Sequence, residues 1–166
     1  MFLAHLPAGY LLTKKLQSLL KEKRFLILGL VAGILPDLDI LYFYLLDNRQ
    51  TLHHDYWTHI SFYWVALALV SFLAILLFKQ KKYLTAATIF FANIFLHLIL
   101  DTIVGRIEWL YPFSKVSYYL FTVPVKYDFW VYNFIFHWSF ILEIGIIIWA
   151  IIEALKNYYA QKSETD

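Results

Sequence analysis

The stretch YLTAATIFFANIFLHLILDTI, residues 83–103, is the most decisive part of this chain for its fold. It is long enough to cross a bilayer as a helix, which takes about 20 mostly apolar residues. Towards its far end it carries Asn93, His97 and Asp101. Ionisable groups are costly beside lipid, so those inside an apolar segment usually face a protein interior and mark a functional site. The stretch therefore predicts a membrane helix whose last turns belong to such a site.

Further apolar segments flank this stretch. Residues 57–78 and 131–152 are long enough to span a bilayer, whereas residues 2–12 and 25–35 are shorter. A helix over the last of these should break or kink at Pro36. Of the 166 residues, 61% are hydrophobic and 16% are charged, whereas a soluble domain has roughly 25% charged residues. We therefore expect an all-α fold, a polytopic membrane bundle of about five helices.

The last two expected helices are separated by residues 106–130, a polar and aromatic connection. It is too long for a simple turn, so we expect a long loop or a lid. Within it, residues 116–125 alternate in polarity and predict a β-hairpin. We expect residues 1–160 to form a single membrane-embedded helical domain and residues 161–166 to be a disordered tail.

Gly29 and Gly33 form a G-x-x-x-G spacing. Small residues four apart let two helix backbones approach closely, and Ala4, Ala8 and Gly9 are the candidate neighbours. Two glycines that occur by chance in an apolar helix would give the same pattern, so the sequence leaves both interpretations open.

If the expected helices alternate in direction, the ionisable residues divide between the two ends of the bundle. Ten of the fourteen lysines and arginines then lie at one end. The positive-inside rule makes that end cytoplasmic. The opposite end, which we expect on the extracytoplasmic side of the inner membrane, gathers histidines and aspartates. These are His5, Asp37, Asp39, His54, His59, His97, Asp101 and His137.

Histidine and aspartate are the ligands typical of a hydrolytic zinc or mixed-metal centre. The chain has no cysteine, so a thiolate zinc site is excluded. His97 and Asp101 are four apart and share a helix face, as metal ligands or as a buried hydrogen-bonded pair. Asp37 and Asp39 lie at the expected helix break and could be metal ligands or a general base, although Asp39 could also cap the next helix.

His54 and His59 are five apart, so on one helix they would diverge by roughly 140°. They can converge only if His54 precedes the helix and His59 lies in its first turn, with Thr58 or Asp55 as the N-cap residue. Of the adjacent His53 and His54, we expect one to point inward.

The remaining candidates have weaker patterns. His5 lies near the start of the first helix, as a ligand or an interfacial histidine. His137 could be a ligand, a proton donor or a core residue, and Glu143 lies roughly 120° away from it around the helix, where it could support a ligand. Three residues could bind an anionic substrate group or anchor to headgroups. They are Arg106, Tyr111 and Lys126.

The order of these groups resembles the YdjM-like, LexA-regulated inner-membrane proteins, a bacterial and archaeal family of membrane-bound, predicted metal-dependent hydrolases. The matching elements are His5 with Gly9, Gly33-x-x-Pro36-Asp37-x-Asp39, His54-x-x-x-Thr58-His59, His97-x-x-x-Asp101 with Gly105, and Tyr111-Pro112-Phe113. The resemblance favours His54 over His53 as the ligand. The chain departs from the family pattern at Asp55 and Ile60, where arginine and serine are common.

The family is also distantly similar to zinc-dependent phospholipases C, which are all-helical. That similarity implies that Asp101 bridges metal ions, surrounded by His97, by His54 or His59, and by Asp37 or Asp39. A second histidine–glutamate pair does not carry over, because Ile141 stands four residues after His137.

We therefore expect two or three divalent ions, zinc first and manganese as the second candidate. Asp37 or Asp39 would be the general base in hydrolysis of a phosphoester in a phospholipid or lipid-linked phosphate. The alternatives are a metal transporter or metal sensor of the membrane, and a non-catalytic membrane scaffold. We expect the bilayer and a lipid substrate as partners, and no nucleic acid.

Overall fold

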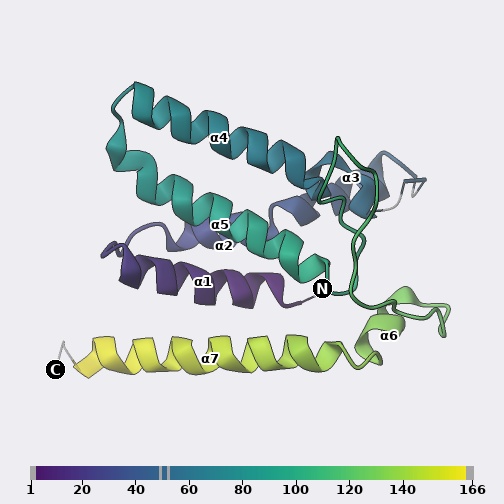
Figure 1. Ribbon diagram of the computed structural model, residues 1–166. Coiled ribbons are helices and arrows are strands. Elements are labelled where there is room, and N and C mark those ends of the chain that lie inside the picture. The colour runs from purple at the N-terminus through teal and green to yellow at the C-terminus, as the bar shows by residue number, and fades with distance from the viewer. Residues whose placement is uncertain (1–2, 49, 52, 164–166) are drawn as a thin grey trace.

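A computed structural model describes residues 3–48, 50–51 and 53–163 of the chain (Figure 1). These residues form seven α-helices, four short 3-10 helices and no strand, which confirms the all-α prediction. The α-helices are α1 (His5–Leu19), α2 (Leu26–Ile34), α3 (Asp39–Leu45), α4 (Ser61–Leu77), α5 (Leu84–Asp101), α6 (Trp130–Ile135) and α7 (Phe140–Ser163). The 3-10 helices are η1 (Pro36–Leu38), η2 (His53–Asp55), η3 (Trp57–His59) and η4 (Lys81–Tyr83).

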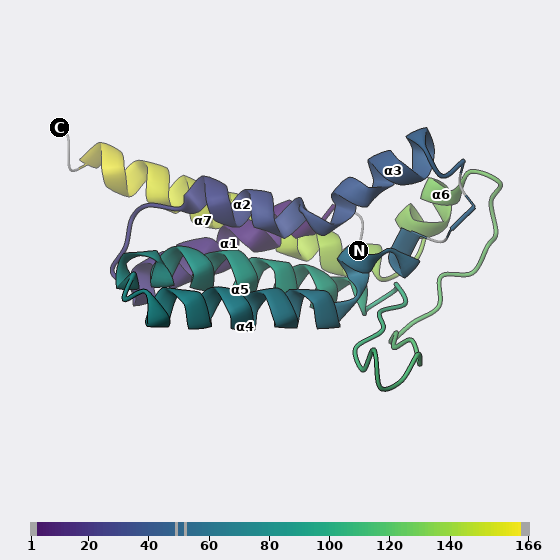
Figure 2. The same cartoon turned by 90° about the horizontal axis from the view of Figure 1, so that it is seen from above.

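The centre of the bundle is formed by α1, α2 and α5, which contact one another. Helix α4 packs against α5, and α7 packs against α1, so α4 and α7 are the outer helices (Figures 1 and 2). A buried apolar cluster that includes Ala32, Trp64, Ile94 and Leu98 joins α2, α4 and α5. The outer faces of α4 and α7 remain apolar and exposed, as expected of helices that contact lipid.

Glycines set the close approach of α1 to α2. A Cβ atom added at Gly33 would lie 3.6 Å from the Cα of Gly9 and 3.4 Å from the carbonyl oxygen of His5. A Cβ atom added at Gly29 would collide with the side chain of Thr13. The G-x-x-x-G prediction of a helix contact is therefore confirmed, and it includes Gly9 as predicted.

The predicted break at Pro36 is also confirmed. Helix α2 ends at Ile34, and the chain bends by 51° into Pro36–Leu45. Proline has no backbone N–H and clashes with the preceding turn, so the helix cannot continue straight. The bend carries Asp37 and Asp39 out of the α2 helix and turns α3 away from the bundle (Figure 2).

Two helix starts differ from the prediction. Helix α4 begins at Ser61 rather than at Trp57, and its N-cap residue is Ile60, so neither Thr58 nor Asp55 caps it. The Thr58 hydroxyl donates a hydrogen bond to Asp39 instead. The N-cap residue of α3 is Leu38, and Asp39 already lies within the first turn of that helix, so Asp39 does not cap it.

The C-terminal region departs from the prediction in a second way. The single helix expected over residues 131–152 is two helices, α6 and α7, separated by a break that contains His137. Nδ1 of His137 lies 2.8 Å from the Ser139 hydroxyl, a local hydrogen bond that competes with helical geometry. Helix α7 continues to Ser163, so residues 161–163 are helical rather than a disordered tail. Residues 164–166 lie outside the described part of the chain.

The connection between α5 and α6 is a long loop, as predicted: residues 102–129 are all described and contain no helix. The hairpin predicted within residues 116–125 is absent from this described loop. Tyr118 instead pairs with Ile107, and their two backbone hydrogen bonds measure 2.9 and 3.1 Å. The loop therefore folds back onto its own first residues, which follow directly after Asp101.

Among the described residues, one helix is long and apolar enough to cross a membrane, Lys81–Asp101. A second crossing results if the bent pair Leu26–Ile34 and Pro36–Leu45 counts as one span. Helix α4 is apolar but has only 17 residues, short of the roughly 20 that a bilayer requires. The five-helix polytopic arrangement therefore stays a prediction.

Candidate metal centre

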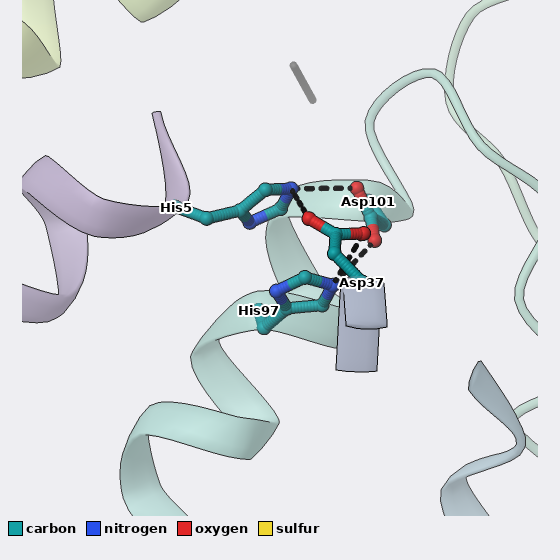
Figure 3. A group of neighbouring side chains, drawn as sticks. All are labelled: His5, Asp37, His97 and Asp101. Carbon is teal, nitrogen blue, oxygen red and sulfur yellow. Dashed lines mark ion pairs between the residues drawn. The ribbon is translucent and has the colours of Figure 1, made fainter. Parts of the chain in front are cut away.

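Buried histidines and aspartates meet at one end of the bundle, where α5 ends and α1 begins. Helix α5 contributes His97 and Asp101, the first residue of α1 is His5, and the bend after α2 contributes Asp37. Figure 3 shows these four side chains directed towards one another. His54 from η2 and His59 from η3 complete the set. We call these six residues the His/Asp cluster.

Asp101 lies at the middle of the cluster and is only 1% exposed. Its Oδ1 atom is 3.0 Å from Nε2 of His5. Its Oδ2 atom is 3.0 Å from Nε2 of His97, 3.5 Å from Nε2 of His59 and 3.7 Å from Nε2 of His54. One carboxylate therefore faces four imidazoles, three through one oxygen and one through the other.

Asp37 is the second carboxylate of the cluster and the more open one, with 27% of its side chain exposed. Its Oδ1 atom is 3.5 Å from Nε2 of His97 and 3.6 Å from Nε2 of His59. Its Oδ2 atom is 4.0 Å from Nε2 of His5. Asp37 thus faces three of the same imidazoles from the side that reaches solvent.

A hydrogen bond at Nδ1 of His97 decides which nitrogen of this ring faces the carboxylates. Nδ1 of His97 lies 2.8 Å from the carbonyl oxygen of Gly33, which can only accept a hydrogen bond, so Nδ1 carries the proton. In a neutral ring, Nε2 then presents a lone pair to the carboxylates of Asp37 and Asp101. Either a second proton on Nε2 or a metal ion between Nε2 and the carboxylates would satisfy this arrangement, and a backbone carbonyl on the far nitrogen is typical of metal-ligating histidines.

His59 is oriented in the same way as His97, but its Nδ1 faces a carboxylate rather than a backbone carbonyl. Its Nδ1 lies 2.8 Å from Oδ2 of Asp39, which also accepts the Thr58 hydroxyl, and its Nε2 faces Asp37 and Asp101. A carboxylate that orients a histidine in this way raises the basicity of the ligating nitrogen. The structure therefore places Asp39, predicted as a ligand, behind His59 rather than among the groups that face one another.

The cluster strongly favours positive charge at His59. Burial lowers the pKa of this imidazole, but its contacts with Asp101, Asp37 and Asp39 raise the pKa to about 11. Three largely buried carboxylates around one histidine need compensation by protons or by a metal ion, because uncompensated buried charge is costly.

The ligand atoms form two groups that could each hold a metal ion. The first contains His5, Asp37, His97 and Asp101, and the second contains His54, His59 and Asp101. Within each group the ligand atoms all lie within 4.8 Å of one another. Nitrogen and oxygen donors of these kinds suit zinc and manganese. Asp101 is common to both groups, as a bridging carboxylate would be.

Two kinds of contact hold His5, the N-terminal residue of the cluster, in place. The ring of His5 stacks on that of His97, with 3.8 Å between ring centroids and 20° between ring planes. The buried carboxylate of Glu143 accepts hydrogen bonds from the backbone N–H groups of Leu3 and Ala4. Glu143, predicted to support a ligand, thus ties α7 to the residues immediately before His5.

Other predicted site residues have different surroundings. His137 bonds to Ser139 in the α6–α7 break. The Arg106 guanidinium lies 5.6 Å from the ring centroid of Tyr119, and the ring of Tyr111 lies against Tyr63 at 6.1 Å. The backbone N–H of Lys126 donates to Asn133 at 2.7 Å. These contacts of Arg106, Tyr111 and Lys126 are therefore made with loop and helix residues outside the His/Asp cluster. The side chain of His53 lies outside the described part of the chain, whereas His54 belongs to the cluster.

Two residues that support the loop around His54 were not predicted as site residues. A Cβ atom at Gly105 would collide with the ring of His54, so this glycine makes room for the histidine. In the sequence, Gly105 was marked only by its place in the family pattern. Asp47 accepts the backbone N–H of Thr51 at 2.7 Å and the hydroxyl of Tyr56 at 2.8 Å, which lowers the pKa of Asp47. Burial and Asp47 raise the pKa of Tyr56 to about 12.

The fold and the site define a class: a helical protein with membrane-capable helices and a buried His/Asp cluster that could hold metal. A family model described as YdjM inner membrane protein matches residues 1–161, and the chain belongs to this family. The family resemblance is thereby confirmed, and the family description indicates an inner membrane protein. No curated protein and no solved structure matches the chain.

Proposed function

We propose that this chain is a membrane-embedded, metal-dependent hydrolase that cleaves a phosphoester bond in a phospholipid or lipid-linked phosphate. The observation that carries the proposal is the position of Asp101. Its Oδ1 faces His5, and its Oδ2 faces His54, His59 and His97. A buried carboxylate shared between two ligand groups suits a dinuclear hydrolytic site, in which two ions lie close together.

The site would hold two divalent ions, with zinc as the first candidate and manganese as the second. Such ions supply a hydroxide near neutral pH and neutralise phosphate charge. The imidazoles of His5, His54, His59 and His97 would hold these ions together with the carboxylates of Asp37 and Asp101. Manganese fits the first group, which has two carboxylates, better than the second, which has one, because manganese prefers carboxylate ligands.

The two candidate general bases take different roles. Asp37 faces the cluster on one side and solvent on the other, so it can accept a proton from an attacking water. Water would add to phosphorus while Asp37 takes its proton, and the bond from phosphorus to the leaving oxygen would break. That oxygen would leave as an alcohol on taking a proton from Asp37 or from solvent. Oδ2 of Asp39 is already hydrogen-bonded to His59 and Thr58, so we assign Asp39 the positioning of His59.

The open side of the cluster points to where a substrate enters. Asp37 is 27% exposed and His54 is 26% exposed, whereas His59, His97 and Asp101 are almost completely buried. The cluster lies at the end of the membrane-capable helix α5, the depth at which lipid phosphates are found. This position supports a lipid phosphate as the substrate.

We propose a multi-pass topology with the cluster on the extracytoplasmic side. Residues 21–24 and 79–82 together carry six lysines and arginines. Figures 1 and 2 show both turns at the end of the bundle opposite to the cluster. The positive-inside rule makes the basic end cytoplasmic.

A metal transporter has less support. It requires polar groups along a path through the bundle. Deeper in the bundle, Asn93 donates hydrogen bonds to the Thr13 hydroxyl at 3.0 Å and to the Ile89 carbonyl at 2.8 Å. The bond to Thr13 joins α1 to α5, as polar residues commonly do between membrane helices, and the bond to Ile89 lies within α5.

The proposal is tested with purified, zinc- or manganese-loaded protein in mixed micelles. The assay measures release of the phosphoester products from phospholipids and from the water-soluble bis(p-nitrophenyl) phosphate. We expect turnover by the parent and by His137→Ala, and none above background by Asp101→Ala. Metal-loaded parent protein without activity on any phosphoester, or an equally active Asp101→Ala variant, would overturn the proposal.

A further inference from the structure

A cavity of ≈ 720 Å³ lies beside the His/Asp cluster, between the bend after α2, the loop before η3, and α4. Its volume falls within the range of roughly 300–1,000 Å³ that small-molecule sites occupy. Six of its lining side chains are aliphatic or aromatic. They are Leu35, Leu38, Tyr42, Tyr56, Trp57 and Trp64.

Several polar groups in the cavity wall are engaged with the protein. Asp39 accepts the hydroxyl of Thr58, and the indole N–H of Trp64 donates to the Thr58 carbonyl at 2.7 Å. Asp47 accepts the hydroxyl of Tyr56 at 2.8 Å. The surface offered to a ligand is therefore mainly carbon. A sugar would require several polar atoms directed into the cavity, whereas a hydrocarbon chain requires none.

Charge also decides which part of a lipid phosphate fits. Among the described residues, the charged side chains that line the cavity are the acids Asp39 and Asp47. Two carboxylates disfavour a phosphate group within the cavity, because like charges repel in a weakly screened site. A phosphate would instead lie at the cluster, where the proposed divalent ions would offset the carboxylates of Asp37 and Asp101, and an apolar part of the same molecule would lie in the cavity.

The cavity and the cluster share a wall. Asp39 and Thr58 line the cavity and also hold His59 in place, so the two sites are separated by a single layer of side chains. Tyr42 is 51% exposed and Trp57 is 58% exposed, so part of the aromatic wall of the cavity is open to the surroundings of the protein.

We propose that this cavity binds a hydrocarbon chain, acyl or polyprenyl, of the phosphoester substrate while the phosphate lies at the His/Asp cluster. The inference rests on the proposed function. It assigns chain recognition to Leu38, Tyr42 and Trp57, none of which belongs to the cluster.

The first test compares chain lengths. For the parent protein, kcat/KM is measured with a long-chain phospholipid and with its short-chain, monomeric counterpart. In Tyr42→Ala, the ratio of long-chain to short-chain kcat/KM should fall about tenfold, the loss expected when an apolar contact of side-chain size is removed. The control is Trp149→Ala, which removes an aromatic ring that is 59% exposed on α7, and its ratio should stay that of the parent. An unchanged ratio in Tyr42→Ala, or an equal fall in both variants, would overturn the inference.

The second test does not depend on turnover. A phosphatidylglycerol with a photoreactive diazirine at the end of its acyl chain is incorporated into vesicles with the parent protein, irradiated, and mapped by peptide mass spectrometry. Labels concentrated on residues 35–42 and 56–64, and reduced in Tyr42→Ala, support the chain site. Labels spread over the outer faces of α4 and α7 alone would overturn it. Cavity labelling in a preparation that hydrolyses no phosphoester overturns the proposed function alone, whereas hydrolysis without cavity labelling overturns the inference alone.

Discussion

Two regions of the molecule each contain a histidine next to an apolar helical segment: the end of α5 has His97, and the break between α6 and α7 has His137. The surroundings of the two histidines differ. At the end of α5, His97 meets Asp37, Asp101 and the carbonyl oxygen of Gly33. At the break, the hydrogen bond of His137 is to Ser139, two residues further along the chain. A ligand cluster thus depends on several segments that converge, which the close packing of α1, α2 and α5 provides.

The strongest test of this comparison removes the residue that both ligand groups share. A metal ion at a hundred times its Kd stabilises the folded state by about 2.7 kcal/mol. We expect Asp101→Ala to lose this zinc-dependent stabilisation, because the four surrounding imidazoles lose their common anion. Thermal unfolding in detergent, with and without zinc, measures the effect. The exposed Asp128→Asn is the control, and an Asp101→Ala variant that zinc stabilises as much as the control would contradict the bridging role.

The second test changes one histidine in each region. We expect His97→Ala to weaken zinc binding by about 100-fold or more, since loss of an outer partner already costs about 10–100-fold. We expect His137→Ala to bind zinc as the parent does. Competition with a fluorescent chelator gives both affinities. Similar losses in the two variants would remove the distinction between the two regions.

A third, smaller effect is expected at Asp39. Asp39→Asn keeps the shape of the side chain but removes the charge that orients His59, so zinc affinity should fall about 10–100-fold with the stoichiometry retained. Titration calorimetry separates affinity from stoichiometry. The neighbouring Asp55→Asn serves as the control. Loss of one whole zinc equivalent in Asp39→Asn would instead make Asp39 a direct ligand.

The smallest effect is expected from a pair of glycines. Gly105→Ala directs a methyl group against the ring of His54, whereas Gly145→Ala on α7 has nothing within 4 Å of the added atom. We expect Gly105→Ala to weaken zinc binding several-fold, because the second ligand group loses its geometry, and Gly145→Ala to leave it unchanged. Equal zinc affinities in these two variants would show that His54 does not need this space.

Local rules predicted much of the fold and most of the cluster. Proline chemistry gave the bend after α2, the glycine spacing gave the α1–α2 contact, and the four-residue spacing put His97 and Asp101 on one face of α5. The position of Asp39 behind His59 could not be predicted in the same way. It depends on Thr58 bonding to Asp39 across 19 residues rather than capping α4.

The break between α6 and α7 was missed for a different reason. Its sequence, Phe136-His137-Trp138-Ser139, contains neither glycine nor proline, so no local signal marks it. Local sequence rules also do not decide how many helices cross the membrane, because α1 and α7 combine apolar faces with charged residues.

The most direct test of the central claim is the metal content of the detergent-solubilised protein, measured by elemental mass spectrometry beside its Asp101→Ala and His137→Ala variants. We predict about two equivalents of zinc or manganese in the parent and in His137→Ala, as in other dinuclear hydrolytic sites, and near-complete loss in Asp101→Ala. A parent protein that takes up no metal after reconstitution, or an Asp101→Ala variant that keeps its full complement, would contradict the account and make the cluster a hydrogen-bonded helix contact.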